Sequence, residues 1–242
     1  MDEAHVWKRE SNRVVKAIVF DFDGTVVDTE SAVYAAWREI YERHGGALPL
    51  ERWVNVVGAA GKLFDPYEEL EVQIGRPVDR AVLEPLRRAR ELELVARERP
   101  RPGVLELLEE ARRRGLKVGL ATNSRSDWVE THLRALGIRS YFEAVATADD
   151  VEIGKPDPAV YRLAAERLGV RPEDALAIED SPSGALGAVR AGLVCVVVPG
   201  PLTRGVSLPM AHAVWETLAG VSVDDLMSLW RSVRAPERRD QR

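Results

Sequence analysis

Short apolar runs alternate with helical patterns along most of the chain. The helical patterns repeat every three or four residues, whereas the runs are rich in β-branched and small apolar residues. Such alternation is typical of a parallel sheet built from strand–helix units. We therefore expect an α/β fold with a Rossmann-like parallel sheet and helices on both faces. The predicted strands are residues 17–20, 117–122, 144–147, 175–178 and 193–198.

Two segments between the predicted strands have the apolar stripe of an amphipathic helix, with positions i, i+3, i+4 and i+7 or i+8 on one side. Helix boundaries carry independent signals: Asp157-Pro158 and Ser181-Pro182 are typical helix starts, and Gly169 and Gly192 follow the last apolar positions. The stripes are Val104, Leu107, Leu108 and Ala111, and Val160, Leu163, Ala164 and Leu168.

One long segment interrupts the alternation. Residues 30–97 contain helix-favouring stretches but no convincing strand. A simple crossover between parallel strands needs only about a dozen residues, so this segment is predicted to be an inserted α-helical cap domain. The predicted core domain is then residues 1–29 together with residues 98–242, and hinges are expected near residues 28–30 and 97–101.

Composition limits the partners and the compartment. The 242 residues include 34 Lys and Arg against 39 Asp and Glu, a net charge of -5, which disfavours binding to nucleic acid or to an anionic membrane. The chain has one cysteine, Cys195, in an apolar run, and a polar start with no signal-peptide pattern. We expect a cytoplasmic protein; the oligomeric state is left open.

Two carboxylates follow the first predicted strand. Asp21 and Asp23 come directly after residues 17–20, and Gly24 permits a sharp turn. Ligands of open α/β sheets bind beyond the carboxyl ends of the strands. Neighbouring carboxylates in such a crevice require a shared proton or a cation, and Mg²⁺ suits an acidic pair better than a zinc site without His or Cys. The alternative is a solvated turn stabilised by its own Asp side chains.

Four motifs in order resemble those of the haloacid dehalogenase superfamily of phosphotransferases with an aspartate nucleophile. The resemblance spans nearly the whole chain and is narrower for the subgroup with an inserted helical cap, which includes phosphoglycolate phosphatases and β-phosphoglucomutases. Each motif lies at a predicted strand end or in the loop beyond it. They are Asp21-Phe22-Asp23-Gly24-Thr25, Leu120-Ala121-Thr122-Asn123-Ser124, Gly154-Lys155-Pro156-Asp157 and Ile178-Glu179-Asp180-Ser181.

The resemblance implies a role for each acidic residue. Asp21 would attack phosphorus and form an aspartyl phosphate, while Asp23 would protonate the leaving oxygen and later activate water. Mg²⁺ would be held by Asp21, the backbone carbonyl of Asp23, and Asp180. Glu179 would bind the ion directly or orient a water bound to it, and the sequence leaves both possibilities open.

The resemblance also implies a phosphate-binding set. Thr122 and Asn123 would donate to the transferring phosphoryl group, and Lys155 would supply positive charge to this group and to Asp21. Plain structural alternatives exist, since Thr122 and Asn123 could cap the helix expected near Ser126 and Lys155 could be an exposed loop lysine. Asp157 is interpreted as a helix cap.

Residues of the cap are candidates for substrate contact. Residues 57–62 form a Gly-rich loop with one cation, so Gly58 and Lys62 could contact a phosphate or a hydroxyl group of the substrate. A solvated loop between two helices is the alternative. Caps of this subgroup close over the site, which is expected of a mobile lid.

The predicted function is a Mg²⁺-dependent phosphatase that hydrolyses a small phosphorylated metabolite, a sugar phosphate or a related monoester. The main alternative is a β-phosphoglucomutase-type isomerase, in which a His after the hinge Thr and an Arg in the cap loop are expected; here Val33 and residues 58–62 occupy those regions. A 2-haloacid dehalogenase needs neither Asp23 nor a metal, and a non-catalytic binder does not need the intact set Asp21, Asp23, Lys155 and Asp180. Both are less consistent with the motifs.

Overall fold

The central element is a parallel sheet. The computed structural model describes residues 14–54, 65–205, 207 and 209–235, and within them six strands follow the order β3-β2-β1-β4-β5-β6, with every neighbouring pair parallel. The five predicted strands are confirmed, and a sixth short strand was not predicted. The strands are β1 Ala17–Phe20, β2 Lys117–Ala121, β3 Ala144–Ala146, β4 Ala175–Glu179, β5 Val194–Val197 and β6 Ala213–Val214.

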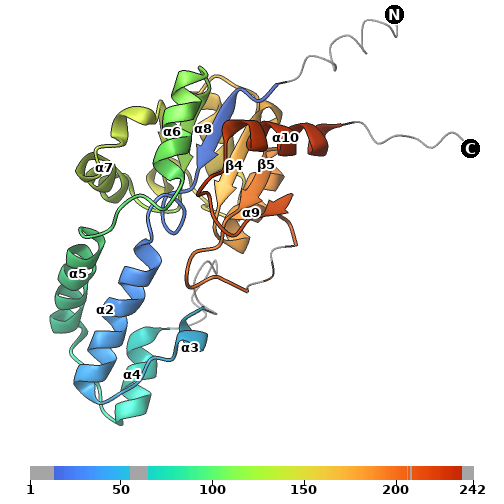
Figure 1. The fold of residues 1–242 in the computed structure, drawn as a ribbon. Helices are drawn as coiled ribbons and strands as arrows, with labels where there is room; N and C mark the ends of the chain where they lie inside the picture. The colour runs from blue at the N-terminus through green and yellow to red at the C-terminus, as the bar shows by residue number, and fades with distance from the viewer. Residues whose placement is uncertain (1–13, 55–64, 206, 208, 236–242) are drawn as a thin grey trace, which may run out of the picture.

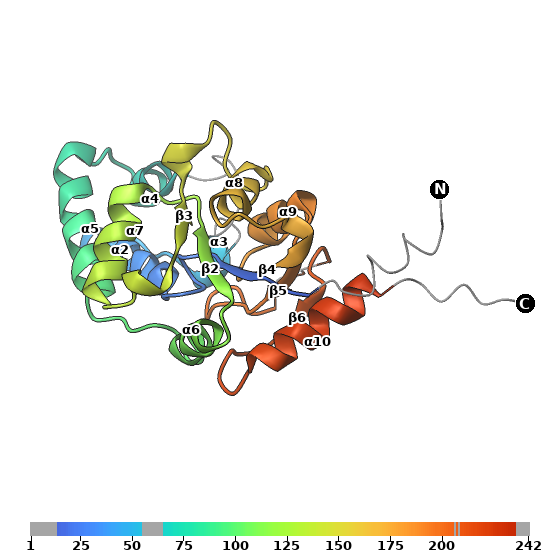
Figure 2. The same ribbon diagram turned by 90° about the horizontal axis from the view of Figure 1, so that it is seen from above.

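Helices cover both faces of the sheet, as Figure 2 shows. One face carries α6 (Val104–Arg113), α7 (Ser126–Ala135) and α10 (Val223–Arg234), and the other carries α8 (Ala159–Arg167) and α9 (Pro182–Ala191). Short 3-10 turns lie at Arg139–Tyr141, Ala148–Asp150 and Pro172–Asp174. The predicted Rossmann-like α/β class is therefore confirmed.

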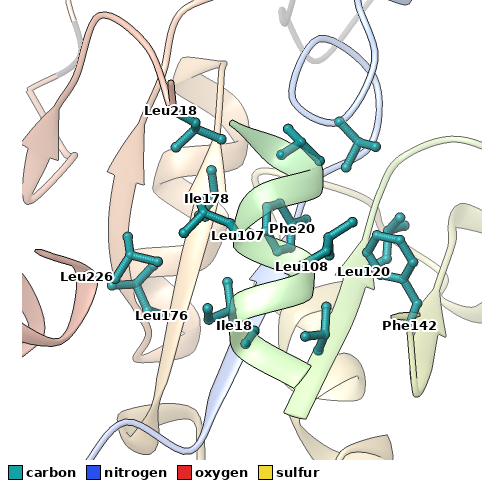
Figure 3. Close-up of a cluster of buried hydrophobic side chains, with 14 of the residues drawn as sticks. Ile18, Phe20, Leu107, Leu108, Leu120, Phe142, Leu176, Ile178, Leu218 and Leu226 are labelled. Carbon is teal, nitrogen blue, oxygen red and sulfur yellow. The ribbon is translucent and has the colours of Figure 1, made fainter. Parts of the chain in front are cut away.

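Successive residues of β1 enter two separate cores, because side chains of a strand alternate between its faces. Ile18 and Phe20 pack beneath α6 with Leu107 and Leu108 (Figure 3), and all four are fully buried. Ala17 and Val19 point the other way, toward Val160 and Ala164 of α8. Each buried Leu or Phe side chain stabilises the fold by about 1.5–3 kcal/mol relative to an exposed one.

The inserted segment is helical. Between β1 and β2 the chain forms α2 (Thr29–His44), α3 (Leu50–Val54), α4 (Pro66–Ile74) and α5 (Arg80–Val95), which lie together at one end of the core in Figure 1. These helices have an apolar cluster of their own, which includes Trp37, Tyr41, Leu70 and Leu83. The inserted helical cap is confirmed, while its predicted limits, residues 30–97, stay a prediction.

Most predicted helix ends are found where the sequence places them. The Ser181 hydroxyl accepts a hydrogen bond from Gly184 N at 3.1 Å before α9, and Gly192 ends this helix with φ of 101°. Helix α8 begins one residue later than expected: Pro158 occupies the cap position, and the Asp157 carboxylate accepts from Ala159 N at 2.9 Å. In the part of the chain that is described, no helix has the length and apolar character needed to cross a membrane.

Candidate active site

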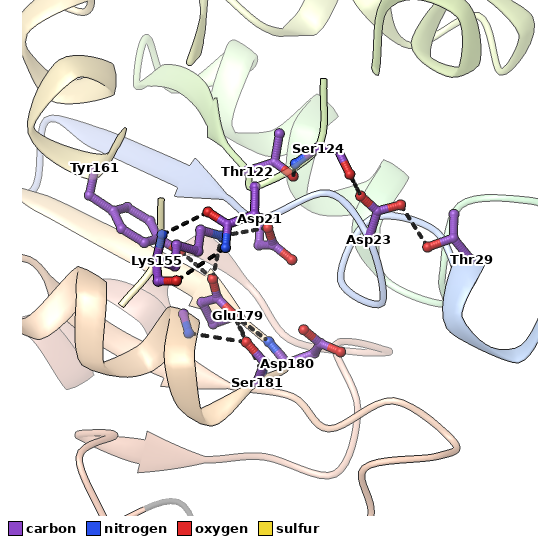
Figure 4. A network of polar contacts seen from close by, with 12 residues as sticks. Asp21, Asp23, Thr29, Thr122, Ser124, Lys155, Tyr161, Glu179, Asp180 and Ser181 are labelled. Carbon is purple, nitrogen blue, oxygen red and sulfur yellow. Dashed lines mark hydrogen bonds and ion pairs between the residues drawn. The ribbon is translucent and has the colours of Figure 1, made fainter. Parts of the chain in front are cut away.

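The acidic residues of the first and fourth motifs lie side by side because their strands are neighbours. Strands β1 and β4 pair with Phe20 opposite Ile178, so Asp21 and the pair Glu179–Asp180 emerge at the same edge of the sheet (Figure 4). Carboxylate oxygens of the three residues lie within 4.8 Å of one another, and all three side chains are buried. Two motifs that are more than 150 residues apart in the sequence thus form one acidic cluster.

Two glycines allow the backbone to approach these carboxylates. Gly24 has φ of 79°, and a Cβ atom there would lie 2.1 Å from Asp180 Oδ2. At Gly184, the first turn of α9, a Cβ atom would lie 1.9 Å from Glu179 Oε1. The sharp turn predicted at Gly24 is left-handed, and the absence of a side chain there also allows the close approach to the acidic cluster.

Lys155 is the counter-charge within the cluster. Its Nζ lies 2.5 Å from Asp21 Oδ1 and 2.6 Å from Glu179 Oε1, and its side chain is 4% exposed. It is therefore not an exposed loop lysine. Burial lowers the pKa of Lys155, but Asp21 and Glu179 outweigh this effect and hold its pKa above the usual value, so the side chain is an ammonium.

Glu179 is fully buried and held by five protein donors. Its Oε1 accepts from Lys155 and from the Tyr161 hydroxyl, and its Oε2 accepts from Asp180 N at 3.1 Å, Ser181 N at 3.3 Å and Ser181 Oγ at 3.1 Å. In this arrangement Glu179 contributes negative charge to the cluster and positions Lys155. Asp21 and Asp180, by contrast, line the cavity directly.

The cluster holds three carboxyl groups and one cationic side chain. Burial raises the pKa of Asp21 to about 8; Lys155 opposes this rise, whereas Glu179 and Asp23 add to it. Burial, together with Asp21 and Glu179, also raises the pKa of Asp180 well above its usual range. One ammonium thus faces three carboxyl groups, and a further cation would lower the cost of ionising them in this buried site.

Asp23 lies beside this cluster and accepts three hydrogen bonds. Thr29 Oγ1 and Trp128 Nε1 donate to its Oδ1 at 2.7 and 3.0 Å, and Ser124 Oγ donates to its Oδ2 at 2.5 Å. Figure 4 shows the Ser124 and Thr29 contacts. Because Thr29 is the first residue of α2, one donor comes from the base of the cap and the other two from the core.

Neither Thr122 nor Asn123 caps α7. The N-cap residue of that helix is Arg125, which makes no side-chain cap. Thr122 lines the cavity and is 2% exposed. Its hydroxyl accepts a hydrogen bond from Ser124 N at 3.0 Å. Asn123 holds the loop of the third motif, since its Oδ1 accepts from Lys155 N at 2.7 Å and its Nδ2 donates to Lys155 O at 3.2 Å.

A cavity of about 440 Å³ separates these residues from the cap. Its cap wall is formed by Glu30 and Val33 of α2 and by Arg88 and Glu91 of α5. Burial, with Asp23, Asp28 and Glu91 nearby, raises the pKa of Glu30 to about 7. The cavity has the size of a small-molecule site. Gly58 and Lys62, the predicted cap contacts, lie outside the described residues.

Besides the cap-wall residues, sequence reasoning missed two aromatic residues that donate hydrogen bonds to the motif carboxylates. Trp128 lies in the first turn of α7 and reaches Asp23, and Tyr161 lies on the buried stripe of α8 and reaches Glu179. Both resemble ordinary core aromatics in the sequence. The available signal is their position, since each lies within about two helical turns of a motif that carries chemistry.

Comparison with known proteins agrees with this geometry. Residues 15–192 match the model of the haloacid dehalogenase-like hydrolase family, and the chain belongs to this family. It is 47% identical over 190 residues to "Putative phosphatase YhcW" of Bacillus subtilis, covering 78% of this chain and 86% of that protein. It is also 33% identical to fructose-1-phosphate phosphatase YqaB of Escherichia coli, covering 75% of this chain and 95% of that protein.

A solved structure shares both fold and sequence. A mutant of CbbY from Rhodobacter sphaeroides, in complex with xylulose-1,5-bisphosphate, matches with a TM-score of 0.70 and 30% identity, covering 88% of this chain and 99% of that one. The predicted enzyme class, a phosphoric monoester hydrolase of this family, is thereby confirmed.

Proposed function

We propose that the protein is a Mg²⁺-dependent phosphatase that hydrolyses a small phosphorylated sugar through an aspartyl phosphate on Asp21. The observation that carries the proposal is the position of Asp21, a buried carboxylate 2.5 Å from the Lys155 ammonium at the base of the cavity. A carboxylate nucleophile divides hydrolysis into two easier transfers.

The first transfer moves the phosphoryl group onto the protein. An oxygen of Asp21 attacks phosphorus, the bond to the sugar oxygen breaks, and Asp23 gives its proton to that oxygen. In the second transfer Asp23 takes a proton from water, the water oxygen attacks the same phosphorus, and Asp21 is released with inorganic phosphate. Lys155 and the Thr122 hydroxyl would stabilise the charge of the transferring oxygens, and both residues line the cavity.

The donor set fits a hard divalent cation. Asp21 and Asp180 offer carboxylate oxygens at the cavity, as Mg²⁺ prefers, and the backbone carbonyl of Asp23 is the third predicted ligand. Glu179, which does not line the cavity, would contribute negative charge and hold Lys155 in position. The ion would offset the repulsion between the nucleophile and the phosphate.

The cavity wall supports a polar, hydroxylated substrate. Glu30 and Glu91 can accept hydrogen bonds from sugar hydroxyls, and Arg88 can donate them. The volume of about 440 Å³ accommodates a phosphorylated monosaccharide. The E. coli relative is named for fructose 1-phosphate and the CbbY structure contains a sugar bisphosphate, which agrees with this class of substrate.

The mutase alternative is less consistent with the cap wall. Where a mutase would be expected to have a His after the hinge, Val33 lines this cavity, and an aliphatic side chain transfers no proton. Conversion of β-glucose 1-phosphate to glucose 6-phosphate in the presence of a bisphosphate primer would establish the mutase instead. A dehalogenase would not need Asp23, yet Asp23 lines the same cavity as Asp21 and accepts three hydrogen bonds.

Steady-state phosphate release with Mg²⁺ tests the proposal. A panel would include fructose 1-phosphate, glucose 6-phosphate, xylulose 1,5-bisphosphate and 4-nitrophenyl phosphate. We expect at least one sugar phosphate to be hydrolysed with a kcat/KM in the enzymatic range, on the order of 10⁴ M⁻¹s⁻¹ or more. Turnover of no phosphate monoester in the panel would contradict the proposal.

Mg²⁺ is expected to raise the melting temperature more at pH 8 than at pH 6. Burial raises the pKa of Asp21 to about 8 and that of Asp180 well above its usual range, so above about pH 4 these two groups hold more protons in the folded protein than in the unfolded chain. Their contribution to stability without metal therefore falls as the pH rises toward 8. The ion competes with these protons, so its stabilising effect grows over the same range.

Melting curves with and without Mg²⁺ at both pH values provide the measurement, and Asp180→Asn is the control. The variant should lose most of the Mg²⁺-dependent rise. An equal rise in the variant and the wild type would place the ion elsewhere in the protein.

A further inference from the structure

We propose that Trp128 is a positioning residue for the acid step: its indole N–H holds one oxygen of Asp23 as an acceptor, so that the transferable proton is carried by the other oxygen. The inference rests on the proposed function and deepens it. It assigns a role to a side chain outside the four motifs.

The contacts of Asp23 separate its two oxygens. Oδ1 accepts from the Trp128 indole at 3.0 Å and from Thr29 at 2.7 Å, whereas Oδ2 accepts from the Ser124 hydroxyl at 2.5 Å. An indole nitrogen can only donate, but a hydroxyl can donate or accept. The Thr29 and Ser124 hydroxyls can each turn to accept a proton from Asp23, whereas the Trp128 indole cannot. Oδ1 therefore keeps one fixed donor beside a second donor, while the single donor of Oδ2 can turn, so Oδ2 is the oxygen better placed to carry the proton.

Trp128 is itself fixed in place. Its ring packs on His132 with centroids 4.0 Å apart, and a ring nitrogen of His132 lies 2.7 Å from the Trp128 carbonyl oxygen. His132 is 8% exposed and also contacts the Phe22 ring at 6.3 Å between centroids. Phe22 stands between the two motif aspartates, so the indole is supported from the same loop that carries Asp23.

The contact favours release of the proton. In the first transfer the Asp23 carboxyl group loses its proton to the sugar oxygen as the P–O bond breaks, and it becomes a carboxylate. The indole N–H stabilises this carboxylate, because a hydrogen bond to a charged acceptor is stronger than one to a neutral acceptor. Loss of the donor should therefore slow transfer from a leaving group that needs protonation, and should affect one that does not much less.

Trp128→Phe keeps the aromatic body and removes the donor. We expect kcat/KM for the best sugar phosphate of the panel to fall about 10- to 100-fold, the range for one hydrogen bond to a charged group. For 4-nitrophenyl phosphate, whose leaving group departs without a proton, we expect a fall of less than about threefold by the same reasoning. The measured quantity is kcat/KM, because it depends only on the steps up to and including departure of the leaving group in the first transfer.

Trp230→Phe is the matched control. The Trp230 indole donates to Glu173 O at 3.1 Å in the core, away from the cavity. It should lower the melting temperature and leave the ratio of the two kcat/KM values unchanged. Should Trp128→Phe fail to fold, Trp128→Met also has no hydrogen-bond donor and should show the same selective loss.

The outcomes separate the inference from the proposed function. Turnover of both substrates by the wild type with an equal fall in the Trp128 variant, or no fall at all, overturns the inference and leaves the phosphatase intact. No turnover of either substrate by the wild type overturns the proposed function and the inference with it.

Discussion

Asp21→Asn should abolish turnover, with a fall in kcat on the order of 10⁴-fold or more, as is found when a covalent nucleophile is removed. An amide oxygen is a poor nucleophile, so the variant would form no acyl phosphate. The fold should persist, because Asn has nearly the same shape and removes one of three buried carboxylates around Lys155. Steady-state phosphate release provides the measurement, and a melting curve checks the fold.

Asp23→Asn is the comparison that separates the two aspartates. It removes the proton donor and leaves the nucleophile, so acid-quenched mixtures with labelled 4-nitrophenyl phosphate should still contain phosphorylated protein, whereas Asp21→Asn should give none. Phosphate release by Asp21→Asn within tenfold of the wild type would contradict the role of Asp21. Label on both variants would place the acceptor at another residue.

The parallel sheet and the acidic edge could be predicted because both depend on local patterns. Strand β1 is a run of four fully buried residues, and the carboxyl ends of neighbouring parallel strands meet at one edge wherever the helices cross over. The insertion was also predictable, since residues 30–97 are too long for a crossover and have no strand pattern. These features need no knowledge of which side chains touch.

The contacts of the site could not be predicted because they join distant elements. Trp128 and Tyr161 have the sequence signature of core aromatics, and only the packing of α7 and α8 on the sheet brings their polar atoms to Asp23 and Glu179. Strand β6 has two residues and lacks a run. Helix α10, however, could have been recognised: Val223, Leu226 and Trp230 have helical spacing and are buried, and Ser222 and Asp225 form a capping box before them.

Lys155→Met should cause a large loss of stability, about 3–5 kcal/mol in the free energy of unfolding, and should abolish turnover as well. The variant keeps the length of the side chain and removes the charge, which leaves Asp21 and Glu179 buried without a cation. Lys155 lowers the pKa of Asp21 in the wild type, so its loss raises that pKa further. Protonation of Asp21 then removes one of the two buried negative charges that lack a cation. The deficit should therefore be smaller at pH 5 than at pH 8. Denaturant unfolding at both pH values measures it.

Two further variants distinguish a specific charge effect from a general one. Lys16→Met removes a lysine that is 53% exposed, and its buried partner Asp174 keeps an ion pair with Arg171, so the variant should cost about 1 kcal/mol or less. In Lys155→Met combined with Glu179→Gln one of the two unpaired carboxylates is neutral, so part of the lost stability should return, while turnover should not, because the ammonium beside the nucleophile is still missing. Recovery of both stability and turnover would mean that Lys155 serves the fold alone. If Lys16→Met lost as much free energy of unfolding as Lys155→Met, burial of the ion pair between Lys155 and Asp21 would not explain the effect of Lys155→Met.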